Sequence, residues 1–220
     1  MKKLNSPPNE RVLGIIKGLR GIYPDVKVEL NFGNVWELMV AVILSAQCTD
    51  VRVNKVTPEL FKKYPTVKSF ASCDLRGLEQ KIYSIGFFKN KAKNIKATAT
   101  KIMADFGGKV PSTMAELITL PGVARKTANV ILTAGFGKND GIVVDTHVIR
   151  LSGLLGLAST KAVKAKNAVQ IEKELMEIVP RSAWGDFSNL LVWHGRRICI
   201  ARRPQCGKCV ISRLCPSSRT

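Results

Sequence analysis

Apolar residues recur along most of this chain at intervals of three and four positions, which is the spacing of one buried face of a helix. The pattern is clearest in four stretches, at residues 35–42, 75–85, 92–106 and 168–178. The first stretch runs on into Ser45, and the last ends before Pro180, which cannot continue a helix. Residues 141–144 are the only strand-like stretch and are too short and isolated to predict a sheet. The pattern therefore predicts an all-α fold.

Polar residues and glycines mark where these helices should begin and end. Asp74 is placed to cap the helix at 75–85, and Asp50 could cap another helix that follows it. Gly86 stands where a residue in the left-handed conformation would end the helix at 75–85. The turn at 137–141 begins and ends with glycine and is the best candidate for a domain junction.

Composition narrows the class of protein. With 220 residues, 45% of them hydrophobic, the chain can bury a core as one globular unit or two small ones. Its longest apolar run, Leu38 to Leu44, is far shorter than the roughly 20 residues that span a bilayer, so we expect no membrane span. Lys and Arg number 35 against 16 Asp and Glu, and the net charge of +19 favours a polyanionic partner. Nucleic acid is the first candidate, although a basic ribosomal or membrane-surface protein would have the same balance.

Part of this charge is concentrated in the helix at 92–106, which should begin near Lys89. The lysines crowded into its first half are Lys89, Lys91, Lys93, Lys96 and Lys101. A run of this kind usually forms a solvated face, so we expect these side chains to point into water.

Four of the six cysteines lie near the end of the chain, in the spacing Cys199-x6-Cys206-x2-Cys209-x5-Cys215. Short loops bring four thiols together at little entropic cost, and both iron–sulfur clusters and structural zinc use such sets. Disulfides would need an oxidising compartment, and no apolar region follows the N-terminal lysines to mark a secretory signal. We therefore predict a metal or cluster site, with the identity of the metal open.

Residues 117–132 predict a helix, a tight turn at Pro121-Gly122 and a second helix that begins near Arg125. The second helix would turn Ala128, Ile131 and Leu132 inward. The backbone amides at a helix N-terminus bind phosphate, and neighbouring cations would fix the register of DNA without reading its bases. An ordinary packing corner between two helices would give the same pattern, so both interpretations stay open.

Lys126 and Asp145 are the candidates for chemistry. At the start of a helix and beside Arg125, the Lys126 amine is in a setting that disfavours protonation, and a neutral amine is a nucleophile. Asp145 could stabilise a developing cation. It could also simply cap a helix that starts near Thr146, and the two roles can coexist.

Three motifs occur in a fixed order: Leu-Pro-Gly-Val-x-Arg-Lys-Thr-Ala-Asn at 120–129, Val-Asp-Thr-His at 144–147, and the terminal cysteine spacing. Together they resemble endonuclease III of the helix-hairpin-helix DNA glycosylase superfamily. The similarity runs from about Asn9 to Cys215 and takes in Leu-Ser-Ala-Gln at 44–47 and Val-Trp-His-Gly-Arg at 192–196.

The resemblance implies an all-α protein of two domains, with DNA lying across the cleft between them. Residues 28–139 would form a six-helix domain with the helix-hairpin-helix at about 114–135, and residues 1–27 with 140–220 would form a cluster domain. The loop at 199–215 would hold a [4Fe-4S] cluster through Cys199, Cys206, Cys209 and Cys215.

The resemblance also implies an activity. Lys126 would be the nucleophile and Asp145 the catalytic carboxylate of a bifunctional enzyme that removes oxidised or ring-damaged pyrimidines from duplex DNA. The enzyme would then cleave the abasic site on its 3′ side by β-elimination through a lysine Schiff base. We expect a monomer that acts on damaged double-stranded DNA in the cytoplasm of a bacterial or archaeal type of cell, with no signal peptide.

By the same resemblance, DNA contacts would come from Gln47, Phe87, Gly122, Ala124, Arg125, Arg202 and Arg203. Gln47 would enter the space left by a flipped base, although an amide at that position could equally be a cap or a turn. Phe87 would act as a wedge between bases, or it could be a core aromatic. Arg202 and Arg203 would contact phosphate, although solvated arginines are the ordinary interpretation.

Two departures from the family pattern affect these contacts. Ala124 replaces the second glycine of the hairpin, and its Cβ could crowd a phosphate or resist a positive φ. Phe87-Phe88 replaces the usual leucine and tyrosine, so the shape of the wedge and the preference for lesions could differ.

The remaining cysteines and the two histidines have ordinary interpretations. Cys48 and Cys73 lie far from the other four cysteines and are expected to be buried thiols. His147 and His194 are expected to be hydrogen-bonded structural residues rather than metal ligands.

The sequence leaves three other functions open. By resemblance, a monofunctional mismatch glycosylase shares the cluster and the hairpin but lacks a lysine at position 126. A non-catalytic hairpin module with structural zinc would bind DNA without cutting it. An electron carrier would explain the cysteines but neither the charge of +19 nor Lys126.

Overall fold

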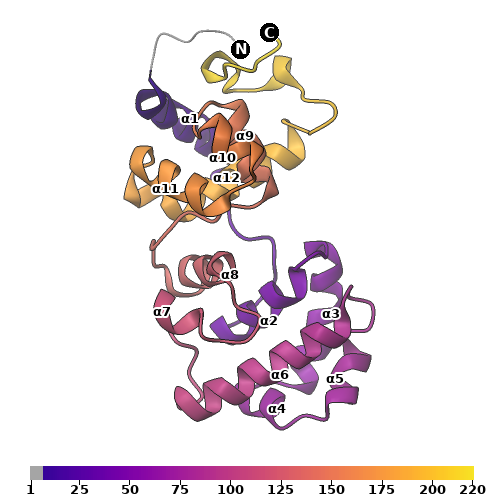
Figure 1. Cartoon of the computed structure of the whole chain (residues 1–220). Helices are drawn as coiled ribbons and strands as arrows, with labels where there is room; N and C mark the ends of the chain where they lie inside the picture. The colour runs from indigo at the N-terminus through magenta and orange to yellow at the C-terminus, as the bar shows by residue number, and fades with distance from the viewer. Residues whose placement is uncertain (1–6) are drawn as a thin grey trace. The chain divides into compact units, whose positions relative to one another are not determined.

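The computed structural model describes residues 7–220, and over this range the chain is helical, with no strand. The all-α prediction is confirmed. The chain divides into two compact units (Figure 1). We call Glu29–Lys138 the hairpin unit, and Met1–Val28 with Asn139–Thr220 the thiol unit. The predicted roles of residues 28–139 and of 1–27 with 140–220 as the two domains of a glycosylase remain a proposal.

The hairpin unit is built from seven α-helices, the last of which continues into one π-helical turn. They are α2 (Val35–Ser45), α3 (Asp50–Lys63), α4 (Val67–Ala71), α5 (Leu75–Lys81), α6 (Phe88–Asp105), α7 (Met114–Leu117), α8 (Arg125–Val130) and η1 (Ile131–Gly135). The long helix α6 packs against α2, α4 and α5, and Ile95, Ala99 and Ile102 on its inner face are fully buried. Each fully buried aliphatic side chain contributes about 1.5–3 kcal/mol to the free energy of unfolding. This helix is therefore the central helix of the unit's core.

Side-chain caps set the starts of these helices. Asp74 caps α5 as predicted, because its Oδ2 accepts a hydrogen bond from the Gly77 N–H at 2.8 Å. The prediction for Asp50 is wrong. Thr49 caps α3 by accepting a hydrogen bond from the Arg52 N–H at 3.3 Å, so Asp50 is the first helical residue. Thr and Asp are both good caps, and sequence alone did not separate two that are adjacent.

The end of α5 also differs from the prediction. The helix stops at Lys81 instead of continuing to residue 85, and Gly86 has no positive φ. Phe87, with φ of 58°, takes the left-handed conformation and directly precedes α6. Glycine is the usual residue in this conformation because a Cβ opposes it, so a phenylalanine there stores strain.

The thiol unit contains five longer helices and three short 3₁₀ turns. They are α1 (Pro8–Ile22), α9 (Thr146–Leu154), α10 (Thr160–Lys164), α11 (Ala168–Ile178), η2 (Arg181–Ala183), α12 (Trp184–Arg197), η3 (Cys206–Lys208) and η4 (Ser212–Leu214). The bounds of α11 are those predicted from the apolar spacing at 168–178. Side chains from α1, α9, α11 and α12 share one core, which includes Ile15, Leu151, Leu175 and Phe187.

Arg11 ties the first helix to the rest of the thiol unit. Its guanidinium is buried and donates hydrogen bonds to the carbonyl oxygens of Leu155 at 2.7 Å and Gly156 at 3.2 Å, just past the end of α9. A further hydrogen bond at 3.0 Å reaches the Leu214 oxygen, next to Cys215. One cation therefore anchors the cysteine-containing end to two helices.

None of the helices within residues 7–220 has the length and apolar character needed to cross a bilayer.

Candidate functional site

The predicted helix-hairpin-helix is present at residues 114–135, which we call the hairpin. Its first helix ends at Leu117, earlier than the predicted stop at Pro121, and a turn leads to Gly122 with φ of 74°. The second helix begins at Arg125 as predicted and runs without interruption into η1. Ala128, Ile131 and Leu132 are fully buried, as their spacing predicted.

Two side chains of α6 hold the turn of the hairpin. The buried Thr98 hydroxyl donates a hydrogen bond to the Pro121 carbonyl oxygen at 2.6 Å. Asn94 lies against Gly122 so closely that a Cβ on this glycine would be 3.0 Å from the Asn94 Nδ2 atom. Glycine is therefore required at position 122 for two reasons: the positive φ disfavours other residues, and Asn94 leaves no room for a Cβ.

Lys126 lies in the first turn of α8, on the exposed side. The residue before the helix, Ala124, has φ of −86° and ψ of 167°, which is an extended conformation open to any residue. The expectation that Ala124 would resist a positive φ is therefore wrong, because no positive φ is needed there. The hairpin therefore starts α8 at Arg125 without a second glycine.

Gln47 and Phe87 stand in two neighbouring turns of the hairpin unit. Gln47 follows the end of α2, is exposed and has φ of 53°. Phe87 is 65% exposed, so it is not a core aromatic. A Cβ on Gly86 would lie 3.8 Å from the Gln47 carbonyl oxygen, which places the two turns side by side. Both side chains are thus available at the surface of one unit.

Asp145 begins α9 in the thiol unit. Its Oδ1 accepts a hydrogen bond from the Val148 N–H at 2.8 Å, so the predicted capping role is confirmed. The side chain is half-buried. The cap uses one carboxylate oxygen and holds the side chain in a single orientation.

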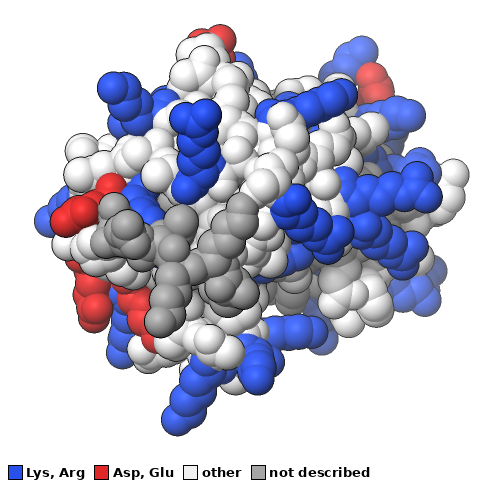
Figure 2. Space-filling model, turned by 90° about the horizontal axis from the view of Figure 1, so that it is seen from above, with Lys and Arg blue, Asp and Glu red and all other residues white. Residues whose placement is uncertain are grey.

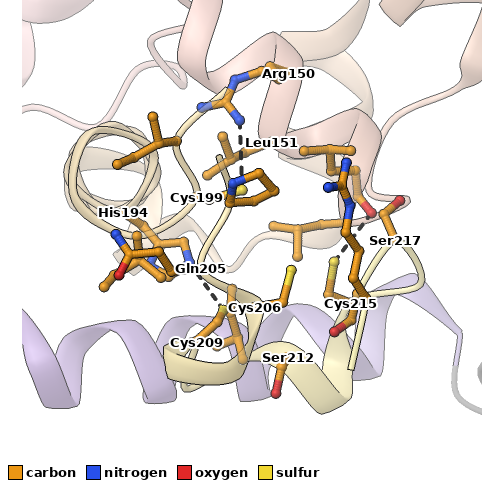
Figure 3. Close-up of a pocket in the computed structure, with 18 of the residues that line it drawn as sticks. Arg150, Leu151, His194, Cys199, Gln205, Cys206, Cys209, Ser212, Cys215 and Ser217 are labelled. Carbon is orange, nitrogen blue, oxygen red and sulfur yellow. Dashed lines mark hydrogen bonds between the residues drawn. The ribbon is translucent and has the colours of Figure 1, made fainter. Parts of the chain in front are cut away.

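The four terminal cysteines line one cavity of about 200 Å³ (Figure 3). Cys199 follows α12, Cys206 opens η3, Cys209 follows η3, and Cys215 follows η4. We call residues 199–215 the thiol segment. All four cysteines are free, and no three His, Cys, Asp or Glu side chains among residues 7–220 converge closely enough to hold a single metal ion.

Nitrogen atoms from α9 and α12 reach two of these thiols. The Arg150 guanidinium donates a hydrogen bond to the Cys199 Sγ atom at 3.7 Å, and the His194 Nε2 atom lies 3.3 Å from the Cys209 Sγ atom (Figure 3). Burial, with the charge of Arg150 adding to it, lowers the pKa of His194 to about 4, so its imidazole is neutral at pH 7. Burial also raises the pKa of the Cys209 and Cys215 thiols, so a cation beside them would be needed to stabilise the thiolates.

Gly195 explains how α9 and α12 come so close. A Cβ there would lie 2.9 Å from the His147 Nδ1 atom and 3.1 Å from an Arg150 guanidinium nitrogen. The helix that begins at Asp145 therefore packs directly on the helix that leads to Cys199. Burial lowers the pKa of His147, while Asp145 opposes this shift. The buried Nδ1 of His147 has no hydrogen-bond partner in the structure.

The remaining predicted residues have ordinary surroundings. Arg202 and Arg203 are exposed within the thiol segment, and Arg125 is exposed at the start of α8. Cys73 is buried as predicted, whereas Cys48 is only half-buried because it lies in the turn after Gln47. Lys and Arg side chains project from much of the face shown in Figure 2.

Comparison with known proteins agrees with this geometry. Residues 40–181 match the HhH-GPD superfamily of base excision DNA repair proteins. Endonuclease III of Synechocystis sp. is 49% identical over 210 residues, which are 96% of this chain and 94% of that protein. The chain belongs to the endonuclease III family. Endonuclease III of Escherichia coli K12 is 41% identical over 203 residues, which cover 92% of this chain and 93% of its relative.

Solved structures extend the similarity to the fold of the endonuclease III family. The structure of a trapped endonuclease III–DNA covalent intermediate, an estranged-adenine complex, matches with a TM-score of 0.87 at 40% identity and covers 96% of this chain and 97% of that chain. A thermostable thymine-DNA glycosylase matches with a TM-score of 0.82 at 23% identity, which shows a shared fold.

Sequence reasoning missed three cations that the structure places at these sites. Arg11 and Arg150 contact the thiol segment, and Lys91 is buried beneath the Gln47 turn. The expectation that Lys91 would be solvated with its neighbouring lysines is wrong, since only 6% of it is exposed. A signal was available, because Lys91 stands four residues before Ile95 on the apolar face of α6.

Proposed function

We propose that this protein is a base excision repair enzyme, a bifunctional DNA glycosylase and abasic-site lyase for oxidised or ring-damaged pyrimidines in duplex DNA. The observation that carries the proposal is the exposed Lys126 in the first turn of α8, directly after the Gly122 turn, in a chain of the endonuclease III family. The family relationship supports a DNA glycosylase and lyase acting in base excision repair. The role of each residue and the class of lesion are our inference.

Lys126 is the proposed nucleophile. Its neutral amine attacks the sugar C1′, the N–C1′ bond forms, and the glycosidic bond breaks with its electron pair leaving on the base, which then takes up a proton. Asp145 stabilises the cationic character of the sugar. The sugar ring opens to a Schiff base, a C2′ proton is removed, and its electron pair drives cleavage of the C3′–O bond. A relative trapped as a covalent intermediate with DNA supports a covalent route.

Extrusion of the damaged base must come before this chemistry, because C1′ cannot be reached inside the stack. Leaving the stack costs a few kcal/mol and less for a poorly stacked lesion, so extrusion contributes to selectivity. Gln47 and Phe87 are suited to fill and hold open the duplex, since both are exposed on adjacent turns. The backbone at Gly122 and Ala124, with Arg125, Arg202 and Arg203, would contact phosphates.

The thiol segment is proposed to hold a [4Fe-4S] cluster through Cys199, Cys206, Cys209 and Cys215. The four thiols line one cavity, and membership of the endonuclease III family favours a cluster over zinc there. Bound there, the cluster would cross-link the segment as a scaffold for Arg202 and Arg203.

The main alternative is a monofunctional mismatch glycosylase. The thermostable thymine-DNA glycosylase shares the fold, and fold alone does not decide between the two chemistries. Lys126 favours the lyase, because a monofunctional enzyme needs no amine there. The electron-carrier hypothesis explains neither the hairpin nor the net charge of +19. With chromosomal DNA as the substrate, the enzyme would work as a monomer in the cytoplasm, associated with the nucleoid.

Borohydride trapping on a duplex with one thymine glycol tests the proposal. The natural protein should form a covalent adduct, whereas Lys126→Ala should form none and Lys109→Ala, a change at another exposed lysine of the same unit, should form as much as the natural protein. Base release without an adduct would favour the monofunctional glycosylase. The proposal would be contradicted if folded protein with bound iron showed no base release and formed no adduct.

A further inference from the structure

Lys91 is a buried cation whose side chain has no place in the chemistry proposed above. It lies in the second turn of α6, and its ammonium donates hydrogen bonds to the carbonyl oxygens of Leu44 at 2.9 Å and Ala46 at 2.5 Å. Burial lowers its pKa, which is the sign that the ammonium is costly to hold there. Removing a charge from water must be offset by such hydrogen bonds. A methionine would fill the same space without that cost, so the two carbonyl contacts need an explanation.

The two carbonyls belong to the end of α2, where the chain turns toward Gln47. Carbonyls in the last turn of a helix have no partner within it. Here α2 has no basic residue in its own last turn, and the cap comes from Lys91, more than 40 positions along the chain. Gln47 follows immediately and takes the left-handed conformation, with φ of 53°. The Lys91 ammonium therefore holds the backbone directly before a strained residue.

The second turn directly precedes the helix that carries Lys91. The Phe87 carbonyl oxygen accepts the ordinary i→i−4 hydrogen bond of α6 from the Lys91 N–H at 3.1 Å, and Phe87 is the other left-handed residue of this region, with φ of 58°. Only three residues other than glycine have a positive φ within residues 7–220, and two of them are Gln47 and Phe87. Gln47 directly follows Ala46, whose carbonyl oxygen accepts a hydrogen bond from the Lys91 ammonium, and Phe87 directly precedes the helix that carries Lys91. Such conformations cost about 1–3 kcal/mol each and persist where the surroundings impose them.

We propose that Lys91 is a positioning residue that fixes the Gln47 and Phe87 turns relative to one another, so that both side chains enter the duplex together. This inference rests on the proposed function. It assigns to α6 the joint control of both inserting side chains, while Asn94 and Thr98 farther along the same helix hold the hairpin. The insertion of one side chain is thereby coupled to that of the other.

The test compares two reactions of Lys91→Met, which retains the length of the side chain and removes its donors. Single-turnover release of thymine glycol from a duplex requires insertion, and we expect it to slow at least tenfold. Borohydride trapping on a single-stranded oligonucleotide with an abasic site requires the amine chemistry alone, and we expect it to change less than twofold. Lys93→Met, at an exposed lysine of the same helix, should change both reactions by less than twofold.

A double-mutant cycle separates positioning from a general loss of structure. In a background with Gln47→Ala and Phe87→Ala, Lys91→Met should have less than a twofold further effect on duplex release, because nothing remains to be positioned. If Lys91→Met does not fold, Lys91→Arg is used in the same cycle. Equal effects in both backgrounds, or equal loss of the duplex and single-strand reactions, would overturn the inference. Failure of the natural protein to form any adduct would instead overturn the proposed function.

Discussion

The hairpin and the thiol segment are held in place in opposite ways. The hairpin rests on its own apolar residues, since Leu117, Leu120, Val123, Ile131 and Leu132 are all buried. The thiol segment contains two three-residue turns, and among its side chains only Ile211 is buried. Apolar burial therefore contributes more to the order of the first region than to that of the second, where Arg11 also donates a hydrogen bond to the Leu214 carbonyl oxygen. On the proposed function, the second region depends in addition on the cluster that its thiols would bind.

Removal of one thiol should give the largest difference between the two regions. We expect Cys206→Ser to lose the visible absorbance and most of the iron of the protein, because metal binding is part of the folding free energy of such a segment. Hydrogen exchange of amides in the thiol segment should then accelerate at least tenfold, whereas amides of α8 should be unchanged. Cys73→Ala, which removes a thiol of the hairpin unit, should keep the iron. Unchanged protection of the thiol segment in Cys206→Ser would show that this segment is ordered without its ligand.

The hairpin should be more sensitive to its backbone than to any ligand. Gly122→Ala forces a Cβ into a positive φ, at about 1–2 kcal/mol, and brings it within 3.0 Å of Asn94. We expect Tm to fall by roughly 2–4 °C for each kcal/mol lost, and the affinity for duplex DNA to fall with it. Gly137→Ala is the matched control, because Gly137 also has a positive φ but nothing within 4 Å of its Cβ. If both variants lose equal stability, the contact with Asn94 contributes nothing.

The hydrogen bond that fastens the hairpin to α6 should have a smaller effect. Thr98→Val retains the shape of a fully buried side chain and leaves the Pro121 carbonyl oxygen without its donor at 2.6 Å, which costs about 1–2 kcal/mol. Thr100→Val removes a comparable hydroxyl from the exposed side of the same helix and should cost less than about 0.5 kcal/mol. Urea unfolding of both variants measures the difference. Equal midpoints for the two would mean that the hairpin is held by apolar contacts alone.

The two regions also show which structural features can be predicted from the sequence. The bounds of α11, the cap at Asp74 and the start of α8 at Arg125 follow from neighbours within one or two helical turns, so periodicity and capping rules predict them. The clustering of the four cysteines in space was predictable for the same reason, because they lie close together in the sequence.

The missed features depend on partners distant in the sequence. Arg11 bonds carbonyls 144 and 203 positions away, and Lys91 bonds carbonyls 45 and 47 positions away. Every residue has a backbone carbonyl, so no sequence pattern indicates which carbonyl will accept a hydrogen bond from a buried cation. The strained Phe87 was missed because Gly86 is the better left-handed residue by local rules, and tertiary contacts overrode that preference.

The smallest effect is expected from Ala124→Gly, a change at the start of α8, where the proposed function places a phosphate. Ala124 has an extended backbone, so glycine relieves no strain there. Glycine is a better N-cap than alanine by a fraction of a kcal/mol, but it also costs about 0.5–1 kcal/mol of backbone entropy, so the net change in stability should be within about 0.5 kcal/mol. Because the amides of Arg125 and Lys126 keep their positions, we expect the affinity for an abasic-site duplex to change less than twofold. Ala104→Gly, on the exposed side of α6, should cost roughly 1 kcal/mol and shows that the assay can detect a glycine substitution. A tenfold gain in affinity for Ala124→Gly would mean that the Ala124 Cβ crowds a bound phosphate.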